Sequence, residues 1–349
     1  MDKFTLFRTL AAFAVAGLLS FLLSPVAKHI AHKIGAIDVP KDERRMHKEP
    51  IPRLGGLAVF FAFLIAVIVL VPVDREMQGI LLGALVIVVL GVIDDAVSLS
   101  AKFKFLVQIL AAVIVVLHGV RIDVVSNLNI FSASSYLSLG FWSAPITVIW
   151  IVAITNAVNL IDGLDGLSVG ICTIASLSLL VIAALVSEFN IMVVTAAVAG
   201  ACIGFLPYNI NPAKMFVGDT GATFLGFILA TLSIQGMFKT YAILSFAAPL
   251  LILGLPIFDT LFAICRRLLN GQSPMQADRG HVHHRLIDMG FSQRQTVLIL
   301  YVVSGVLGIS AVLLASSGAE RALSFVIAVL VVSVLVFNIY RLWRRKRKK

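Results

Sequence analysis

The sequence is poor in charged residues and in cysteine. Asp, Glu, Lys and Arg together make up 13% of its 349 residues, whereas hydrophobic residues make up 60%. Its three cysteines, Cys172, Cys202 and Cys265, lie in or beside apolar runs and have no regular spacing. They therefore indicate neither a disulfide framework nor a zinc site, and we interpret them as small packing residues.

Long runs without any charge argue against a soluble core. Residues 81–93, 243–257 and 325–337 contain no charged side chain, whereas surface helices of soluble proteins carry polar residues on one face. The pattern predicts an all-α polytopic integral membrane protein, with residues 1–349 forming a single membrane-embedded domain. Eleven spans are predicted, at 4–27, 54–72, 78–94, 103–119, 143–161, 167–187, 190–207, 220–237, 240–258, 296–315 and 321–340. The first is too long in its apolar core for a signal peptide, so we expect a retained helix.

The basic residues predict the orientation. Twenty-two of the 28 Lys and Arg residues fall on one side if the chain alternates across the bilayer. That side is expected to be cytoplasmic, with the N-terminus outside and the C-terminus inside. The basic tail 341–349 follows a span directly, so we expect it to bind anionic lipids and not nucleic acid. The cytoplasmic loops expected to form the active site are 28–53, 95–102, 162–166, 208–219 and 259–295.

Acidic residues are few, and four groups of them end spans on that same side. These groups are Asp94 with Asp95, Asp162 with Asp165, Asp219, and Asp259. Carboxylates are costly in hydrocarbon and mark ion, proton or substrate sites. Their clustering at one face suits a magnesium-dependent phosphoryl-transfer site. A transporter is the alternative, but its acids are expected near the bilayer midplane.

Adjacent carboxylates such as Asp94 and Asp95 cannot both ionise freely in an apolar site without compensation, so one of them is a candidate general base. The alternative is a solvated pair that caps a helix end, which the helix dipole disfavours at a C-terminus. Asn159 and Asp162 are three residues apart and share a helix face. Their oxygen atoms suit Mg²⁺, although Asx-Gly sequences also form turns.

Other loops offer groups for an anionic substrate. Pro50 and Pro52 keep the first loop extended, so that Lys48 and Arg53 can face an anion, unless the loop merely anchors a helix. Phe216 is an aromatic residue in a polar loop, where it can stack on a flat base or pack against lipid. The fifth loop lacks the closed tetrahedral ligand set that zinc requires. It carries four candidate phosphate ligands, which are Arg279, His281, His283 and His284.

Five motifs in this order resemble the polyprenyl-phosphate N-acetylhexosamine-1-phosphate transferases. They are PRLGG at 52–56, DD at 94–95, NAVNLIDGLDGL at 156–167, FVGDTG at 216–221 and HVHH at 281–284. The resemblance implies transfer of a sugar 1-phosphate from a UDP-sugar to a polyprenyl phosphate, with release of UMP and a requirement for Mg²⁺ (or Mn²⁺). HVHH is similar to the branch that uses UDP-GlcNAc and undecaprenyl phosphate to initiate teichoic acid, O-antigen or related glycans. Val282 interrupts the three consecutive histidines typical of the phospho-MurNAc-pentapeptide branch.

The resemblance also implies roles for single residues. Asn159 and Asp219 are the expected magnesium ligands, and Asp94 or Asp95 is expected to deprotonate or position the lipid phosphate. Lys104 is expected to contact phosphate, and Phe216 with Asp165 to hold uracil. Arg279 and the HVHH histidines are expected at the pyrophosphate or the sugar. Direct displacement and a covalent intermediate on Asp162 or Asp94 both remain open, as does a homodimer.

Overall fold

The computed structural model describes residues 2–40, 49–126, 136–238, 244–272 and 280–317, together with positions 323, 325 and 327. Its helices are α1 (Lys3–Ile34), α2 (Gly55–Leu70), α3 (Arg75–Val97), α4 (Ala101–Leu117), α5 (Ser143–Ile161), α6 (Leu167–Leu185), α7 (Phe189–Asn209), α8 (Gly218–Ser233), α9 (Leu244–Ile252), α10 (Gly254–Leu269), α11 (Val282–Asp288) and α12 (Gln293–Ser317). A 3₁₀ turn covers Gly140–Trp142, and a π-helical turn, Ile234–Phe238, continues α8.

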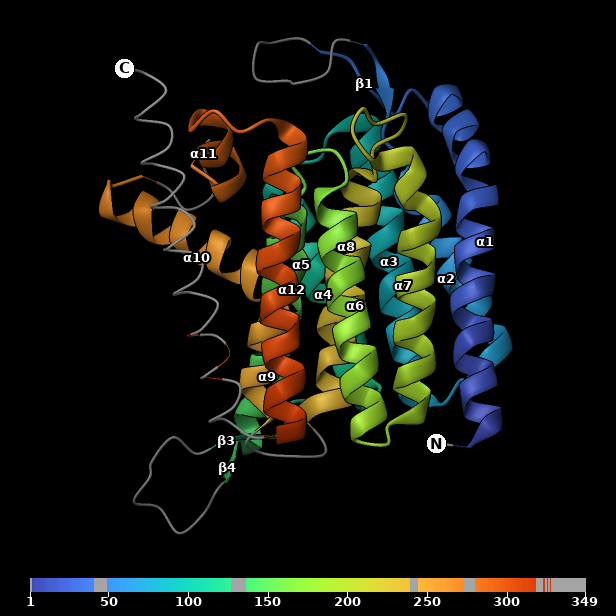
Figure 1. Cartoon of the computed structure of the whole chain (residues 1–349), viewed down its shortest axis with the longest axis vertical. Helices are drawn as coiled ribbons and strands as arrows, with labels where there is room; N and C mark the ends of the chain where they lie inside the picture. Colours follow the sequence, from blue (N-terminus) through green and yellow to red (C-terminus); the bar gives the residue numbers. More distant parts are fainter. Residues whose placement is uncertain are drawn as a thin grey trace.

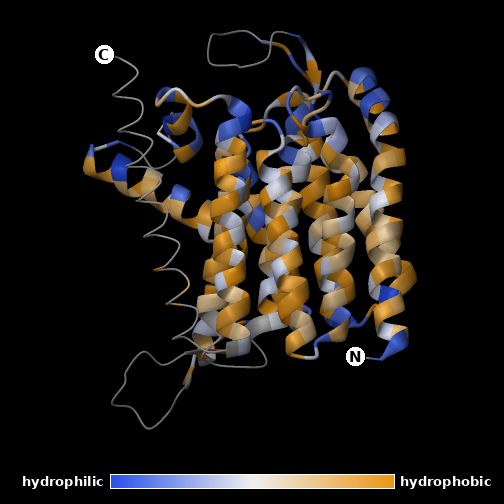
Figure 2. Ribbon diagram, viewed as in Figure 1, coloured by the Kyte–Doolittle hydropathy of each residue, from blue (hydrophilic) through white to orange (hydrophobic). Residues whose placement is uncertain are grey.

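The fold is a bundle of apolar helices that run roughly along one axis (Figure 1). Six helical segments within the described residues are long and apolar enough to cross a membrane. Hydrophobic residues dominate the middle of the bundle, and hydrophilic residues gather towards its two ends (Figure 2). The chain is therefore an α-helical integral membrane protein. The six segments are Lys3–Ile34, Arg75–Val97, Gly140–Ile161, Leu167–Leu185, Phe189–Asn209 and Gln293–Ser316.

The prediction of an all-α membrane protein is confirmed, and two short antiparallel ladders lie outside the bundle. Strand β1 (Ile37–Asp38) pairs with β2 (Ile51–Pro52), and β3 (Val124–Ser126) pairs with β4 (Tyr136–Ser138). The first ladder is at the end of the bundle opposite to the start of α1 (Figure 1).

The first helix is longer than predicted. It continues through Ile34 instead of ending at residue 27, and Gly35 ends it in the left-handed conformation with φ of 75°. Glycine adopts that conformation without strain. The basic residues before it, which belong to the predicted loop, are compatible with a helix. The predicted loop 28–53 therefore begins at Gly35, and the residues before it stay helical. The link between α3 and α4 likewise shrinks from 95–102 to residues 98–100.

The predicted span 240–258 is not one continuous helix, because the helix breaks. Helix α9 ends at Ile252 and α10 begins at Gly254. Pro256 lies in the first turn of α10 and lacks the amide that would continue the ladder from α9. Helix α10 then leans out of the bundle (Figure 1), with Phe262 and Leu269 exposed. The predicted loop 259–295 is consequently half helical, since it includes the end of α10 and all of α11. The predicted span 321–340 and the tail 341–349 lie outside the described residues, apart from three single positions.

Helices α2 and α3 cross the first turn of α8 with their backbones almost touching it. A methyl group built on Gly56 would lie 2.1 Å from the amide nitrogen of Gly221, and one on Gly91 would lie 2.3 Å from Cα of Thr220. Small residues permit this approach between membrane helices. The crossing brings the ends of three helices to one place.

Gly56→Ala is expected to destabilise the protein by about 1–3 kcal/mol, the usual cost of overpacking. The measurement is thermal unfolding of the detergent-solubilised chain. Gly305→Ala in α12 is the matched control, because a methyl group there meets nothing within 4 Å. If both variants unfolded at the wild-type temperature, the close crossing of α2 and α8 would be refuted.

Candidate active site

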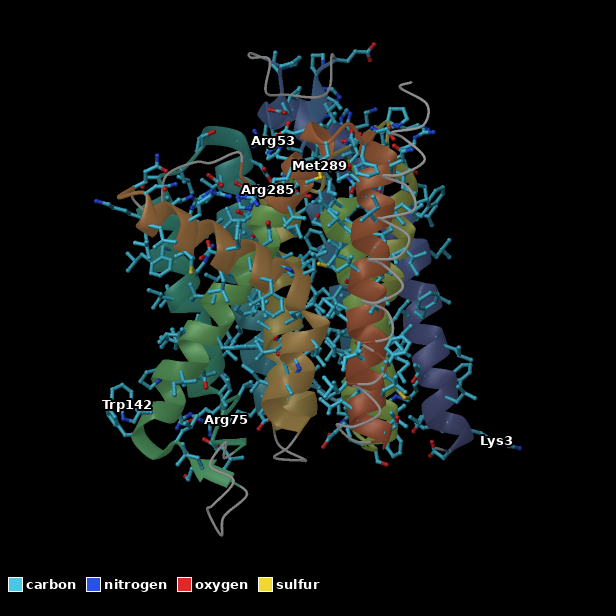
Figure 3. All side chains as sticks on the ribbon, turned by 60° about the vertical axis from the view of Figure 1, so that its left-hand side comes forward. Lys3, Arg53, Arg75, Trp142, Arg285 and Met289 are labelled. Carbon is cyan, nitrogen blue, oxygen red and sulfur yellow. The ribbon has the colours of Figure 1, made fainter. Side chains whose placement is uncertain are left out.

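A cleft of about 1040 Å³ opens at the end of the bundle that carries β1. Arg53 and Arg285 lie at this end, whereas Lys3, Arg75 and Trp142 lie at the other (Figure 3). The cleft is walled by the end of α1, the segment 49–53, the α5–α6 turn, the 209–219 segment and the start of α11 and α12. Its charged and histidine lining residues are Lys28, His32, Asp38, Glu49, Arg53, Asp162, Asp165, Lys214, Asp219 and His284.

The PRLGG and FVGDTG motifs lie side by side, joined by backbone hydrogen bonds. The amide of Phe216 donates to the Pro52 carbonyl at 2.8 Å, and the amide of Gly55 donates to the Phe216 carbonyl at 2.9 Å. Gly218 follows with φ of 70°, and a methyl group there would lie 1.8 Å from the Arg53 carbonyl oxygen. Glycine is therefore required where α8 begins.

Asp219, in the first turn of α8, is the centre of the polar contacts. The Nδ2 of Asn159 donates to its Oδ1 at 2.7 Å, and the Nζ of Lys104 lies 3.2 Å from its Oδ2. The side chain is 27% exposed and lines the cleft. Residues from α4, α5 and α8 thus meet at one carboxylate that a ligand in the cleft can reach.

Asp94 is connected to that carboxylate through Lys104. Its Oδ2 lies 2.7 Å from the Lys104 Nζ, and its Oδ1 accepts the amide of Leu99 at 2.6 Å. Asp94 is only 3% exposed and is not among the residues that line the cleft. The ammonium group of Lys104 therefore bridges the two carboxylates of Asp94 and Asp219.

Asp95 has a different environment from its neighbour. Its carboxylate accepts the amides of Asp219 and Thr220 at 3.0 and 2.9 Å and the hydroxyl of Thr220 at 2.7 Å. The first residues of α8 have no side-chain cap of their own. Asp95, from α3, supplies the acceptor that an N-cap residue usually supplies. The dipole of α3 disfavours an acid at its own C-terminus, but Asp95 caps the N-terminus of a different helix, α8, which the sequence did not predict.

Asp162 and Asp165, in the turn between α5 and α6, both line the cleft. The hydroxyl of Ser168 donates to Asp162 at 2.5 Å, and removal from water raises the pKa of Asp162 to about 7. Asp165 accepts the side chain of Asn211 at 2.9 Å and the amide of Ala213 at 3.0 Å. Asp165 therefore holds the 211–213 segment in place.

The three histidines of HVHH occupy different positions. Nδ1 of His281 lies 2.8 Å from the Asp259 carboxylate, and that carboxylate also accepts the Val282 amide at 2.8 Å. His283 is buried, with its Nε2 2.3 Å from where a Cβ on Gly163 would lie. Burial lowers the pKa of His283 to about 4, so the ring is neutral at physiological pH. Among these three, only His284 lines the cleft, whereas all three were expected at the substrate.

Several other predicted residues also lie at this cleft. Arg53 lines it, with Nε 3.7 Å from Asp95 and Nη1 3.8 Å from Asp38, and Phe216 lines it as well. Lys48 and Arg279 lie outside the described residues. Eight further polar or charged lining residues are not among the predicted site residues: Lys28, His32, Asp38, Glu49, Asn209, Asn211, Lys214 and Gln293. The spacing of four between Lys28 and His32 could have revealed a shared helix face.

The oxygen donors at the cleft fit a magnesium ion. Asp219 and Asp162 both line it, and the Asn159 amide is bonded to Asp219. No group of three His, Cys, Asp or Glu side chains close enough to hold a metal occurs within the described ranges. Mg²⁺ keeps several waters and is commonly bound by one or two carboxylates together with substrate phosphates, so the two carboxylates that line the cleft can suffice for it.

The structure is thus an apolar helical bundle with a charged cleft at one end, as a membrane-embedded enzyme requires. The family model described as "Glycosyl transferase family 4" matches residues 77–237. A relative in Bacillus subtilis, named "Probable undecaprenyl-phosphate N-acetylglucosaminyl 1-phosphate transferase", is 41% identical over 93% of this chain and 90% of its own length. The decaprenyl-phosphate N-acetylglucosaminephosphotransferase of Mycobacterium tuberculosis is 33% identical over 85% of this chain and 80% of its own length. The undecaprenyl-phosphate alpha-N-acetylglucosaminyl 1-phosphate transferase of Thermotoga maritima is 32% identical over 81% and 83%. The chain belongs to glycosyl transferase family 4.

Asp95→Ala is expected to lower the free energy of unfolding by about 2 kcal/mol, because the buried first turn of α8 loses its acceptor. Activity is expected to fall as well, since Asp219 lies in that turn. Thermal unfolding and turnover measure the two effects. Asp288→Ala, an exposed acid in α11, is the control. An Asp95→Ala protein with wild-type stability would contradict the capping role.

Asp162→Asn is expected to stabilise the metal-free protein increasingly as the pH rises. A carboxyl with a folded pKa of about 7 and an unfolded pKa of 3.8 binds more protons when folded, so stability is lost as the pH rises through that window. Asparagine has no charge to form. Thermal unfolding in EDTA at pH 5 and pH 8 measures the effect. An unfolding-temperature difference between variant and wild type that stays constant with pH would refute it.

Proposed function

We propose that the chain transfers N-acetylglucosamine 1-phosphate from UDP-GlcNAc to undecaprenyl phosphate and releases UMP. The observation that carries this proposal is the Asp219 carboxylate, which lines the cleft while Lys104 and Asn159 bind it from two other helices. The names of the Bacillus subtilis and Thermotoga maritima relatives support the same sugar and lipid.

Phosphoryl transfer demands mainly positioning and charge neutralisation, because its transition state is loose. The cleft meets this demand with fixed carboxylates and cations. Asp219 and Asn159, with Asp162 beside them, would hold Mg²⁺ (or Mn²⁺), which when bound neutralises charge on the pyrophosphate. Asp95 keeps the first turn of α8 in place, so that Asp219 faces the cleft.

The donor would lie along the cleft. Phe216 lines the cleft and would stack on uracil. The Oδ2 of Asp165 accepts Asn211 and Ala213, and within the described residues its Oδ1 has no hydrogen-bond partner and would bind the base. Arg53 and His284 supply donors for phosphate or sugar oxygens, and Lys28 and His32 add two more from α1. Lys48 and Arg279 are proposed to contribute from segments outside the described residues.

The acceptor phosphate would approach beside Lys104. Asp94 holds that ammonium group at 2.7 Å and is proposed to position the lipid phosphate through it, or to accept its proton. In direct displacement, a lipid phosphate oxygen bonds to the β-phosphorus. The bond from that phosphorus to the bridging oxygen breaks, and the oxygen leaves on UMP. This route requires no covalent intermediate on Asp94 or Asp162.

The proposed setting is the cell membrane of a bacterium. Eleven spans would put the N-terminus outside and the basic tail 341–349 inside, against anionic lipids. The cleft would face the cytoplasm, where UDP-sugars are present. The product would initiate a cell-envelope glycan such as a teichoic acid or O-antigen, and the enzyme is proposed to work without nucleic acid and to form a homodimer.

The test incubates the purified chain with UDP-GlcNAc, undecaprenyl phosphate and Mg²⁺, and measures UMP and lipid-linked sugar. Production of both in equal amounts is expected, and EDTA is expected to abolish it. Activity only with UDP-MurNAc-pentapeptide would reassign the donor. Ion flux in liposomes without any transfer would favour a transporter.

Asp219→Asn is expected to lower turnover by about a hundredfold or more, the scale for losing a key electrostatic group. The variant keeps the size of the side chain and loses its charge. Asp288→Asn removes an exposed acid outside the cleft lining and is expected to keep wild-type turnover. Near-normal turnover of Asp219→Asn would remove this residue from the reaction centre.

A further inference from the structure

A buried amide pair joins α4 and α5 one helical turn below the reaction centre. We propose that Gln108 and Asn156 are positioning residues, which hold Lys104 and Asn159 at the distances that let both bind Asp219. This inference rests on the proposed function, because it concerns the geometry of that site. Neither residue lines the cleft, so a direct role in binding substrate is not involved.

The contact between the two amides is short and directional. Nδ2 of Asn156 donates to Oε1 of Gln108 at 2.6 Å and to the Val152 carbonyl of its own helix at 2.8 Å. Gln108 is 3% exposed, although it lies in the middle of an otherwise apolar stretch of α4. A buried amide in such a place is costly unless it is hydrogen-bonded, and Asn156 supplies the bond.

The spacing along the two helices connects this pair to the site. Gln108 follows Lys104 by four residues on α4, and Asn156 precedes Asn159 by three on α5, so each pair shares a helix face. The lower pair bind each other, and the upper pair both bind the Asp219 carboxylate. Helices α4 and α5 are therefore linked twice, directly through Gln108 and Asn156 and, one turn away, through Asp219 of α8.

The rest of the buried face of α4 is apolar, and within the described residues further hydrogen bonds to α5 come only beyond the end of α4, such as that from the amide of Ile122 to the hydroxyl of Thr147 at 2.9 Å. Below Gln108 that face consists of small or branched apolar residues, which are Ala111, Ala112, Val115 and Val116. Apolar contacts of this kind tolerate sliding, whereas a single buried polar contact can specify register. A slip of one residue would move Lys104 by about 1.5 Å, and displacements of about 1 Å at a reaction centre can cost a hundredfold in rate.

The alternative is that the amide pair only stabilises the fold, and enzyme kinetics separate the two roles. Gln108→Leu removes the acceptor and keeps the side chain close to its original size. Ser233→Ala is the matched control, because it removes another hydrogen bond between helices, from Trp150 on α5 to Ser233 on α8 at 3.2 Å, away from the cleft. Turnover, KM for both substrates and thermal unfolding are measured on each full-length protein in detergent.

Gln108→Leu is expected to lower kcat by about tenfold or more, with KM for UDP-GlcNAc and undecaprenyl phosphate within about twofold of wild type. Ser233→Ala is expected to keep kcat, whatever its unfolding temperature. If Gln108→Leu kept the kcat of the control, or lost activity only in proportion to its folded fraction, the positioning role would be refuted.

An exchange of the two amides tests the pair directly, and it applies even if the leucine variant does not fold. Gln108→Asn and Asn156→Gln each change the combined length by one methylene, so each alone is expected to lower kcat. Together they restore the length and are expected to recover most of the wild-type kcat. A double variant no better than the single ones would overturn the proposal. Absence of transfer by the wild-type protein would instead reject the proposed function, and with it this inference.

Discussion

The carboxylate of Asp95 at the start of α8 is the contact on which the arrangement of the site depends. A charged group inside an apolar bundle is tolerated only when hydrogen bonds compensate for lost water. Asp95 receives three, two of them from Asp219 and Thr220 amides that α8 leaves without partners of its own. The same bonds fix the turn in which Asp219 faces the cleft, so one interaction compensates a helix end and orients the reactive carboxylate.

The different contacts of the adjacent residues Asp94 and Asp95 show which parts of the site the sequence could predict and which it could not. The ends of α5 agree with the predicted span 143–161, because apolar length and flanking polar residues define a crossing locally. The gathering of Asp94, Asp162 and Asp219 at one end followed from counting spans. The different contacts of Asp94 and Asp95 could not be predicted in that way, because adjacent helix positions point about 100° apart. What each meets depends on α4 and α8, which are distant in sequence.

Other differences have the same origin. The helix break at Leu253 could not be predicted, because it depends on α10 leaning out of the bundle and no local sequence pattern specifies that direction. The HVHH histidines look equivalent in the sequence. In the fold, Asp259 binds His281, Gly163 makes room for His283, and only His284 of the three reaches the cleft. A motif therefore marks a functional segment, but packing decides which of its members can meet a ligand.

The length of α1 fixes the height at which catalysis would take place. Its 32 residues extend about 48 Å at 1.5 Å per residue, well beyond a hydrocarbon layer of about 30 Å. The last turns, with Lys28 and His32, would therefore stand among the lipid headgroups. A water-soluble nucleotide and a lipid-borne phosphate can meet there without either entering the medium of the other.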